Sequence, residues 1–378
     1  MSMPVPSAAP QVEESTPTAE VGSRLVVKDL RKHFPIRGGV FSTVRETVKA
    51  VDGVSFEIPP ARTLGLVGES GCGKTTVGRA LLRLIPATSG RVMFGDKNVL
   101  TAGGRDLREL RRKMQIIFQD PYGSLNPRMT IEQIVGEGIW LHGLAKGREI
   151  RDRVADLLKQ TGLRPEAMTR YPHEFSGGQR QRVGIARALS VDPKFIVCDE
   201  PTSALDVSIR AQIINLLQDL REARGLSYLM ISHDLGVVRH ISDEVAVMYL
   251  GKIVEQAPVE TLFGDTRHPY SLVLLTAIPV PNPKLRGTRT RIRSADADDT
   301  IPSPVKIPSG CPFHPRCPLY HAKGKPEECR TTIPELWPAQ FHSDHLVACH
   351  FRDQSPEDRA SAYSSISTSS APSAPPPG

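Results

Sequence analysis

Residues 68–75 read GESGCGKT, three glycines followed by a lysine and a threonine. They match the pattern G-x-x-x-x-G-K-[ST] and lie between the apolar run TLGLV and the helical run TTVGRALLRL. Because glycine has no side chain, backbone N–H groups of residues 71–74 can close around the β- and γ-phosphates of a nucleotide. Lys74 adds a positive charge and the Thr75 hydroxyl a Mg²⁺ ligand. The predicted nucleotide-binding residues here are Gly68, Glu69, Ser70, Gly71, Cys72, Gly73, Lys74, Thr75 and Thr76.

Two adjacent carboxylates, Asp199 and Glu200, end the apolar run KFIVC. Such a run is typical of a buried strand, so both side chains should emerge at its carboxyl end. Beside a phosphate-binding loop, Asp199 is well placed to hold Mg²⁺, and Glu200 to polarise the water that attacks the γ-phosphate. The sequence therefore predicts nucleotide hydrolysis, with Lys74 and Glu200 among the catalytic groups.

Residues 175–189, FSGGQRQRVGIARAL, place two glycines and three arginines at the start of a predicted helix. The arginines could bind a nucleic-acid backbone, whereas glycines at a helix start let N–H groups approach a phosphate. The net charge of +7 and the pI near 9.1 fit either anionic partner. These residues alone leave both interpretations open.

Four of the six cysteines gather late in the chain with the spacing C-x5-C-x11-C-x19-C: Cys311, Cys317, Cys329 and Cys349. In a reducing compartment such a group indicates a metal site rather than disulfides. Four thiolates suit a [4Fe–4S] cluster. Zinc is the alternative, although no C-x-x-C pair is present, and unliganded thiols are the third reading. Because the cysteines lie outside the nucleotide motifs, we expect cluster loss to loosen the C-terminal region before it alters the nucleotide site.

Short β-branched runs alternate with helical stretches between residues 24 and 275, which predicts an α/β domain with a mainly parallel sheet. Within it, residues of about 120–190 predict a helical subdomain. Residues 276–352 form a C-terminal extension that holds a Pro-rich linker and the cysteines. Residues 1–22 and 353–378 are rich in Pro and Ser and are predicted to be disordered.

The composition excludes several classes of protein. With 378 residues, 39% hydrophobic and 24% charged, the chain is typical of a soluble protein of two or three domains. No apolar run approaches the roughly 20 residues of a membrane span. The N-terminus has acids and prolines but no apolar segment of a secretory signal, so we expect a cytosolic location.

Further motifs follow in order along the chain: IIFQDPYGSLNP with Gln119, FSGGQ at 175–179, SALD with Asp206 and SHD with His233. Together with the two motifs above, they make residues of about 24–350 resemble an ATP-binding subunit of an ABC transporter. The resemblance implies a P-loop NTPase (RecA-like) core with an antiparallel β subdomain and an inserted α-helical subdomain. A small Cys-rich C-terminal module would follow this core.

The resemblance also implies that two such ATPase domains bind head to tail. The signature of one, here Ser176, Gly177, Gly178 and Gln179, would face the γ-phosphate held by the other, with the positive end of its helix dipole aimed at that phosphate. Arg180, Arg182 and Arg187 would then support the interface or the helix surface. No nucleic-acid partner is expected.

Other positions acquire roles by the same resemblance. Gln119 would join Thr75 and Asp199 around Mg²⁺, and His233 would contact the γ-phosphate as a catalytic residue. Asp206 would belong to the ATP-binding residues. Phe34 is expected to stack on adenine, with Phe41 as the second choice.

The insertion PIRGGVFSTVRETVKA, the run RHPYS and the segment IPSPVKIPSGCPFHPRCP resemble the oligopeptide/dipeptide permease ATPases, notably the member with an extra N-terminal loop. The resemblance implies an importer in which two related ATPases pair beneath two membrane subunits, fed by an extracytoplasmic solute-binding protein. The chain would lie at the cytoplasmic face of a bacterial inner membrane. The C-terminal region of this subfamily is associated with a [4Fe–4S] cluster.

Several functional alternatives remain at this stage. Di- and oligopeptides lead as solutes, while nickel, opine-like compounds and oligosaccharides are carried by close relatives. A non-transport ABC ATPase, such as a translation or DNA-repair factor, is one alternative to an importer. A redox sensor that binds metal through the late cysteines is another.

Overall fold

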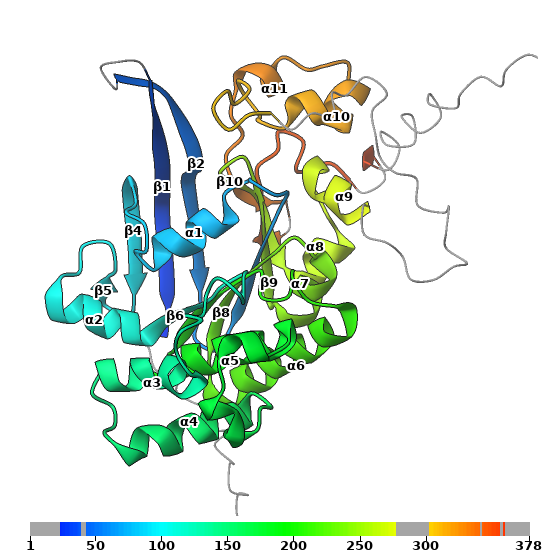
Figure 1. The fold of residues 1–378 in the computed structure, drawn as a ribbon. Coiled ribbons are helices and arrows are strands. Elements are labelled where there is room, and N and C mark those ends of the chain that lie inside the picture. The colour runs from blue at the N-terminus through cyan, green and yellow to red at the C-terminus, as the bar shows by residue number, and fades with distance from the viewer. Residues whose placement is uncertain (1–22, 39–42, 277–301, 341, 356–357, 360–378) are drawn as a thin grey trace, which may run out of the picture.

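The computed structural model describes residues 23–38, 43–276, 302–340, 342–355 and 358–359. The segments predicted to be disordered, 1–22 and most of 353–378, lie outside the described residues, as do Phe41 and residues 277–301 of the linker region. Figure 1 shows two sheets with helices around them. Helices α3, α4 and α5 lie at one end of the molecule, and α10 and α11 lie at the other.

The larger sheet has eight strands in the order β11-β12-β10-β9-β3-β8-β7-β6. Neighbours from β9 to β6 pair in parallel, and the pairs from β11 to β9 are antiparallel. The strands are β3 (Thr63–Val67), β6 (Met114–Ile117), β7 (Phe195–Asp199), β8 (Ser227–Ser232), β9 (Glu244–Tyr249), β10 (Lys252–Pro258), β11 (Trp337–Ala339) and β12 (His342–Val347). Every residue of β3, β7 and β8 is buried, which explains their continuous apolar runs. The predicted α/β fold is confirmed.

The smaller sheet is antiparallel, with the order β2-β1-β4-β5. Its strands are β1 (Leu25–Gly38), β2 (Thr43–Ile58), β4 (Ser89–Phe94) and β5 (Lys97–Asn98), followed by helix α2 (Gly104–Lys113). Register shifts bend the long β1–β2 pair at several points. This sheet is the antiparallel β subdomain that the family resemblance implies.

Helix α1 (Lys74–Leu81) packs directly on the larger sheet. A Cβ added at Gly78 would come within 2.8 Å of Val197 in β7 and 3.0 Å of Ile231 in β8, so glycine lets the helix approach. This contact fixes the loop before α1 against the ends of the parallel strands.

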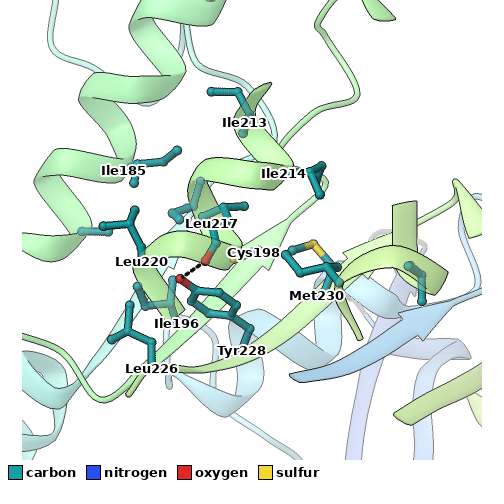
Figure 2. Packing of buried hydrophobic residues seen from close by; sticks show 14 of the residues in the cluster. Ile185, Ile196, Cys198, Ile213, Ile214, Leu217, Leu220, Leu226, Tyr228 and Met230 are labelled. Carbon is teal, nitrogen blue, oxygen red and sulfur yellow. Dashed lines mark hydrogen bonds between the residues drawn. The ribbon is translucent and has the colours of Figure 1, made fainter. Parts of the chain in front are cut away.

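Helix α6 (Val207–Arg224) packs on the larger sheet next to β8. Helices α7 (Leu235–Ile241), α8 (Val259–Gly264) and α9 (Pro269–Thr276) follow it in the chain. Tyr228 of β8 is fully buried, and its hydroxyl donates to the carbonyl oxygen of Leu217 in α6 at 3.0 Å. Figure 2 shows this bond among Ile196, Leu220 and Leu226. The phenol therefore fills the core without leaving an unpaired polar atom.

Three helices carry the region predicted to be a helical subdomain: α3 (Ile131–Leu141), α4 (Arg148–Gln160) and α5 (Gly177–Leu189). Two 3₁₀ turns, η2 (Pro165–Thr169) and η3 (Pro172–Glu174), lie between α4 and α5. The Thr130 hydroxyl accepts from the Gln133 N–H, and the Gln133 side chain accepts from the Thr130 N–H. This capping box sets the start of α3.

The C-terminal region contains a 3₁₀ turn η5 (His314–Arg316), helices α10 (Pro318–Ala322) and α11 (Glu328–Thr331), and the hairpin β11–β12. Strand β12 pairs with β10 and thereby joins the larger sheet. Phe313, Cys317 and Cys329 belong to the same apolar cluster as residues of α5, α6, β7 and β8. The expected separate Cys-rich module is therefore not supported, since this region shares the sheet and core of the rest.

A buried carboxylate, Glu255 of β10, anchors this arrangement. It accepts hydrogen bonds from the N–H groups of Arg267 (2.7 Å) and His268 (3.1 Å), and its Oε1 lies 2.8 Å from Nε2 of His345 in β12. Glu255 and His345 are both completely buried. None of the helices in the described ranges is long and apolar enough to cross a membrane.

Candidate nucleotide-binding and hydrolysis site

The loop between β3 and α1 has a backbone that requires glycine. Gly68, Gly71 and Gly73 have φ of 152°, 81° and 110°. A Cβ at Gly68 would overlap the carbonyl oxygen of Met248, and one at Gly73 that of Ala50. Gly73 is the N-cap of α1 and provides no side chain to cap it. The first N–H groups of α1 are thus free to bind an anion such as a phosphate.

Lys74 is buried inside this loop and stabilises its backbone through hydrogen bonds. Its Nζ donates to the carbonyl oxygens of Gly68 (2.8 Å) and Glu69 (2.9 Å). The loop therefore places a buried cation beside the uncapped start of α1, a combination that suits the binding of nucleotide phosphates. Cys72 is also buried, and burial raises the pKa of its thiol, which fits a loop position rather than a reactive thiol.

Thr75 and Asp199 meet at the edge of the sheet. The Thr75 hydroxyl donates to Oδ1 of Asp199 at 2.8 Å. Burial raises the pKa of Asp199, against the opposing effect of this hydrogen bond. A hydroxyl and a buried carboxylate form an oxygen set of the kind that Mg²⁺ prefers, and a cation would compensate the carboxylate for its lost water. The pair fits the predicted Mg²⁺ site.

Glu200 lies at the centre of a second contact group. Gln119, which follows β6, donates through Nε2 to Oε2 of Glu200 at 3.0 Å, and Nδ1 of His233, which follows β8, lies 3.2 Å from the same oxygen. Glu200 itself has a φ of 46°, in the left-handed region that non-glycine residues seldom adopt. Such strain is characteristic of functional sites. The structure thus brings together three predicted residues that are far apart in sequence.

The signature residues form the start of α5, away from the residues above. Ser176 and Gln179 form a capping box and are exposed. A Cβ at Gly178 would clash with Ile209 of α6, whereas one at Gly177 would meet Leu205 at an ordinary 3.6 Å. No hydrogen bond of the described residues joins 176–179 to 68–75. Gly178 therefore allows α5 to pack closely against Ile209 of α6, whereas a side chain at Gly177 would fit without a clash.

The three arginines of α5 are occupied by main-chain carbonyl groups of the same chain. Arg180 donates to Pro172, Arg182 to Thr161 and Arg187 to Ser124. Guanidinium groups committed in this way do not form a surface for a nucleic-acid backbone. Of the two interpretations of residues 175–189, this geometry favours the one in which the start of the helix approaches a phosphate.

Two further predicted residues lie on separate elements. Phe34 stands on β1 opposite Val48 and is 39% exposed, with Nζ of Lys32 4.6 Å from its ring centroid. An aromatic ring with one open face can stack on a base. Asp206 is the N-cap of α6, and its side chain makes no capping hydrogen bond.

The four late cysteines line one small cavity together with Phe313, Tyr320 and Phe351. Burial raises the pKa of Cys311 and Cys329 to about 11 and that of Cys349 to about 12, so these thiols are neutral at pH 7. No group of three or more His, Cys, Asp or Glu residues in the described part of the chain is placed to hold a metal ion. The arrangement of these side chains thus gives no support to the expected [4Fe–4S] cluster or to the zinc alternative.

Sequence reasoning missed two residues beside the phosphate-binding loop. The Tyr270 hydroxyl accepts from the Glu69 N–H at 2.8 Å, and Arg316 pairs with the Glu69 carboxylate. Tyr270 lies in the run RHPYS and Arg316 in CPFHPRC, both of which carried the resemblance to a subfamily. Nothing local in either run indicates a contact with residue 69.

Comparisons with known proteins agree with this geometry. Two family models match: ABC transporter over residues 51–203, and Oligopeptide/dipeptide transporter, C-terminal region, over residues 254–323. The oligopeptide transport ATP-binding protein AppF of Bacillus subtilis (strain 168) is 48% identical over 327 residues, which cover 86% of this chain and 96% of AppF. The chain is an ATP-binding subunit of the oligopeptide/dipeptide ABC transporter family.

Other matches extend the same result. A putative peptide import ATP-binding protein of Brucella ovis is 49% identical over 325 residues, 86% of this chain and 96% of the relative. The dimeric structure of the ATP-binding cassette MJ0796 with ADP and Pi matches with a TM-score of 0.56 and 28% identity, covering 62% of this chain and 98% of that one. As a member of this family, the chain is an ABC-type ATPase.

The contacts of Glu200 generate a first prediction. Glu200→Gln keeps the size of the side chain but removes the carboxylate that would polarise water. We expect ATP to bind with near wild-type affinity while turnover falls by about 10²–10⁴-fold, the usual contribution of a general base. Phosphate release and equilibrium nucleotide binding by the purified chain measure the two effects. Hydrolysis at a near wild-type rate would remove Glu200 from this role.

Proposed function

We propose that this chain hydrolyses ATP to power solute import, with the residues at the carboxyl ends of β3, β6, β7 and β8 as its catalytic site. The loop 68–74 would bind the phosphates, and Thr75 and Asp199 would hold Mg²⁺, which neutralises phosphate charge when bound. The observation that carries the proposal is the meeting of Gln119 and His233 on the Glu200 carboxylate. From there Glu200 would accept a proton from the attacking water, while Gln119 and His233 orient it.

The proposed ATP site is completed by a second, related ATPase subunit. Ser176, Gly177, Gly178 and Gln179 would face the γ-phosphate held by the partner. Ser176 and Gln179 are exposed, and no hydrogen bond among the described residues joins this segment to the chain's own phosphate-binding loop. The dimeric arrangement of the MJ0796 cassette supports this pairing. Phe34 would stack on adenine, and Asp206 would belong to the ATP-binding residues.

The proposed assembly contains two transmembrane permease subunits and an extracytoplasmic solute-binding protein. The chain would bind it peripherally at the cytoplasmic face of the bacterial inner membrane. Di- or oligopeptides are the proposed solutes, because AppF and the Brucella protein are named for oligopeptide transport and peptide import. These relatives are matched over 96% of their length, which favours an importer over the translation, DNA-repair and redox-sensor alternatives.

The importer proposal is tested with the whole complex. In proteoliposomes that contain the chain, its ATPase partner and both permease subunits, we expect ATP hydrolysis to rise when peptide-loaded binding protein is added. Unloaded binding protein is the control, and the Glu200→Gln complex sets the background. Stimulation by DNA or RNA without any membrane subunit would contradict the proposal.

The proposed role of the signature is tested with Gly177→Asp. The added Cβ would meet only Leu205 at 3.6 Å, so the chain should fold, but the acid would block and repel the partner's γ-phosphate. We expect ATP binding to the variant's own loop to persist while hydrolysis at the partner's phosphate-binding loop falls at least about 100-fold, as for a lost oxyanion donor. Gly103→Asp, at the N-cap of α2 with open space around it, is the matched control. Loss of ATP binding to the isolated Gly177→Asp chain would mean that the signature acts within one chain.

We also propose that Cys311, Cys317, Cys329 and Cys349 hold one [4Fe–4S] cluster. In support, all four line the same cavity. The N–H groups of Tyr320 and Phe351 point to the sulfurs of Cys317 and Cys349 at 3.4 Å, and hydrogen bonds of this kind stabilise cluster thiolates. Bound iron would supply the positive charge that buried thiolates need.

Metal analysis of anaerobically purified protein tests the cluster. We expect about four irons and four labile sulfides per chain, a brown colour, and bleaching by Cys317→Ser. Cys72→Ser, which removes a buried thiol of the phosphate-binding loop, should keep the colour. Stoichiometric zinc without iron would replace the cluster by a zinc site, and the absence of any metal would leave four thiols.

A further inference from the structure

Arg316 forms an ion pair that links the C-terminal region to the phosphate-binding loop. Its two terminal nitrogens donate to the two carboxylate oxygens of Glu69 at 2.8 and 2.9 Å. The two side chains are only 11% and 23% exposed. A bidentate and mostly buried pair of this kind is far stronger than a solvated surface pair.

Glu69 is held on three sides, each by a different element. Arg316 binds its carboxylate, the Tyr270 hydroxyl accepts from its N–H at 2.8 Å, and Nζ of Lys74 donates to its carbonyl oxygen at 2.9 Å. Lys74 is the lysine predicted to bind the nucleotide phosphates. The position of Glu69 is therefore coupled directly to the backbone and the cation of the loop.

The environment of Arg316 is aromatic. The rings of Tyr249, Tyr270 and Phe313 pack against one another with centroids 4.6–5.3 Å apart. The guanidinium lies 6.0 Å from the ring centroid of Tyr249 and 5.8 Å from that of Phe313. The hydrogen bonds to Glu69 raise the pKa of Arg316 further above its usual range, so the group stays charged. With so little water nearby, each ion depends on the other for its charge balance.

We propose that Arg316 is a positioning residue for ATP binding, which neutralises and fixes the Glu69 carboxylate inside the phosphate-binding loop. An unpaired carboxylate there would repel the phosphates of ATP and would be free to move. The C-terminal region, through η5, thereby completes the loop formed 247 residues earlier in the chain. The inference rests on the proposed use of this loop for ATP phosphates.

A cycle of glutamine variants tests this pairing in the full-length chain. We expect Arg316→Gln to weaken Mg-ATP binding about tenfold, because it leaves Glu69 unpaired, and to leave kcat at saturating ATP within about twofold. Glu69→Gln alone should weaken Mg-ATP binding less than Arg316→Gln does, because it leaves no unpaired carboxylate beside the phosphates. The double variant should bind ATP as Glu69→Gln does and better than Arg316→Gln, since no carboxylate remains to repel ATP.

Three controls separate an electrostatic role from a merely structural one. Arg316→Lys keeps the cation and should bind ATP better than Arg316→Gln. Arg330→Gln removes an exposed arginine of the same region and should bind as wild type does. The defect of Arg316→Gln should shrink as salt is raised, because ions screen the repulsion. Thermal melting of each variant shows whether it is folded.

Two outcomes would overturn the inference. If the double variant binds ATP as poorly as Arg316→Gln, the arginine only supports the fold of the C-terminal region. If Arg316→Gln binds as wild type does, the pair has no part in ATP binding. Both outcomes are distinct from failure of the proposed function, in which the wild-type chain itself would not bind Mg-ATP.

Discussion

The parallel pairing of β3, β8, β7 and β6 is the constraint on which the ATP site depends. Val67 pairs with Ser232, Asp199 with Ile231 and Ile117 with Cys198, so the strands end nearly level with one another. Parallel strands that end level deliver the next residues of each to one edge of the sheet. The chain reaches that edge four times, after β3, β6, β7 and β8, and residues of the candidate site follow each of these strands.

Glu200 shows how the sheet and its loops hold an uncommon backbone conformation. Its N–H donates to the carbonyl oxygen of Ile231 at 3.0 Å, and its own carbonyl oxygen accepts from the N–H and the hydroxyl of Ser203. These bonds hold the turn in place and keep Glu200 at a positive φ, a conformation that costs about 1–3 kcal/mol. Gln119 and His233 both contact the Oε2 atom of this carboxylate directly.

The sequence predicted the α/β fold and the loop 68–75 because each has a local signature, whereas the antiparallel sheet was expected only through the family resemblance. Alternating apolar runs indicate strands, and glycines at fixed spacing indicate a loop that carries positive φ. The meeting of Gln119, Glu200 and His233 was expected only through the family resemblance, since spacing alone does not give the order of strands. The late cysteines look like a separate module in the sequence, because the pairing of β12 with β10 and the shared apolar cluster have no local pattern. The contact of Arg316 with Glu69 was missed for the same reason: neither residue is unusual among its own neighbours.

The eight-stranded sheet is completed by a hairpin from far along the chain, and this has a consequence for biosynthesis. Until residues 342–347 leave the ribosome, β10 presents an unpaired edge, and Glu255 lacks the histidine that lies against it in the finished protein. Unpaired strand edges are where growing chains associate wrongly. In the finished protein the outer strand β11 is only three residues long and includes Pro338, which cannot donate a ladder hydrogen bond. The nascent chain thus exposes the unpaired edge of β10 until late in its synthesis. When β12 is made it pairs with β10, and β11 then forms the outer strand, which resists further pairing.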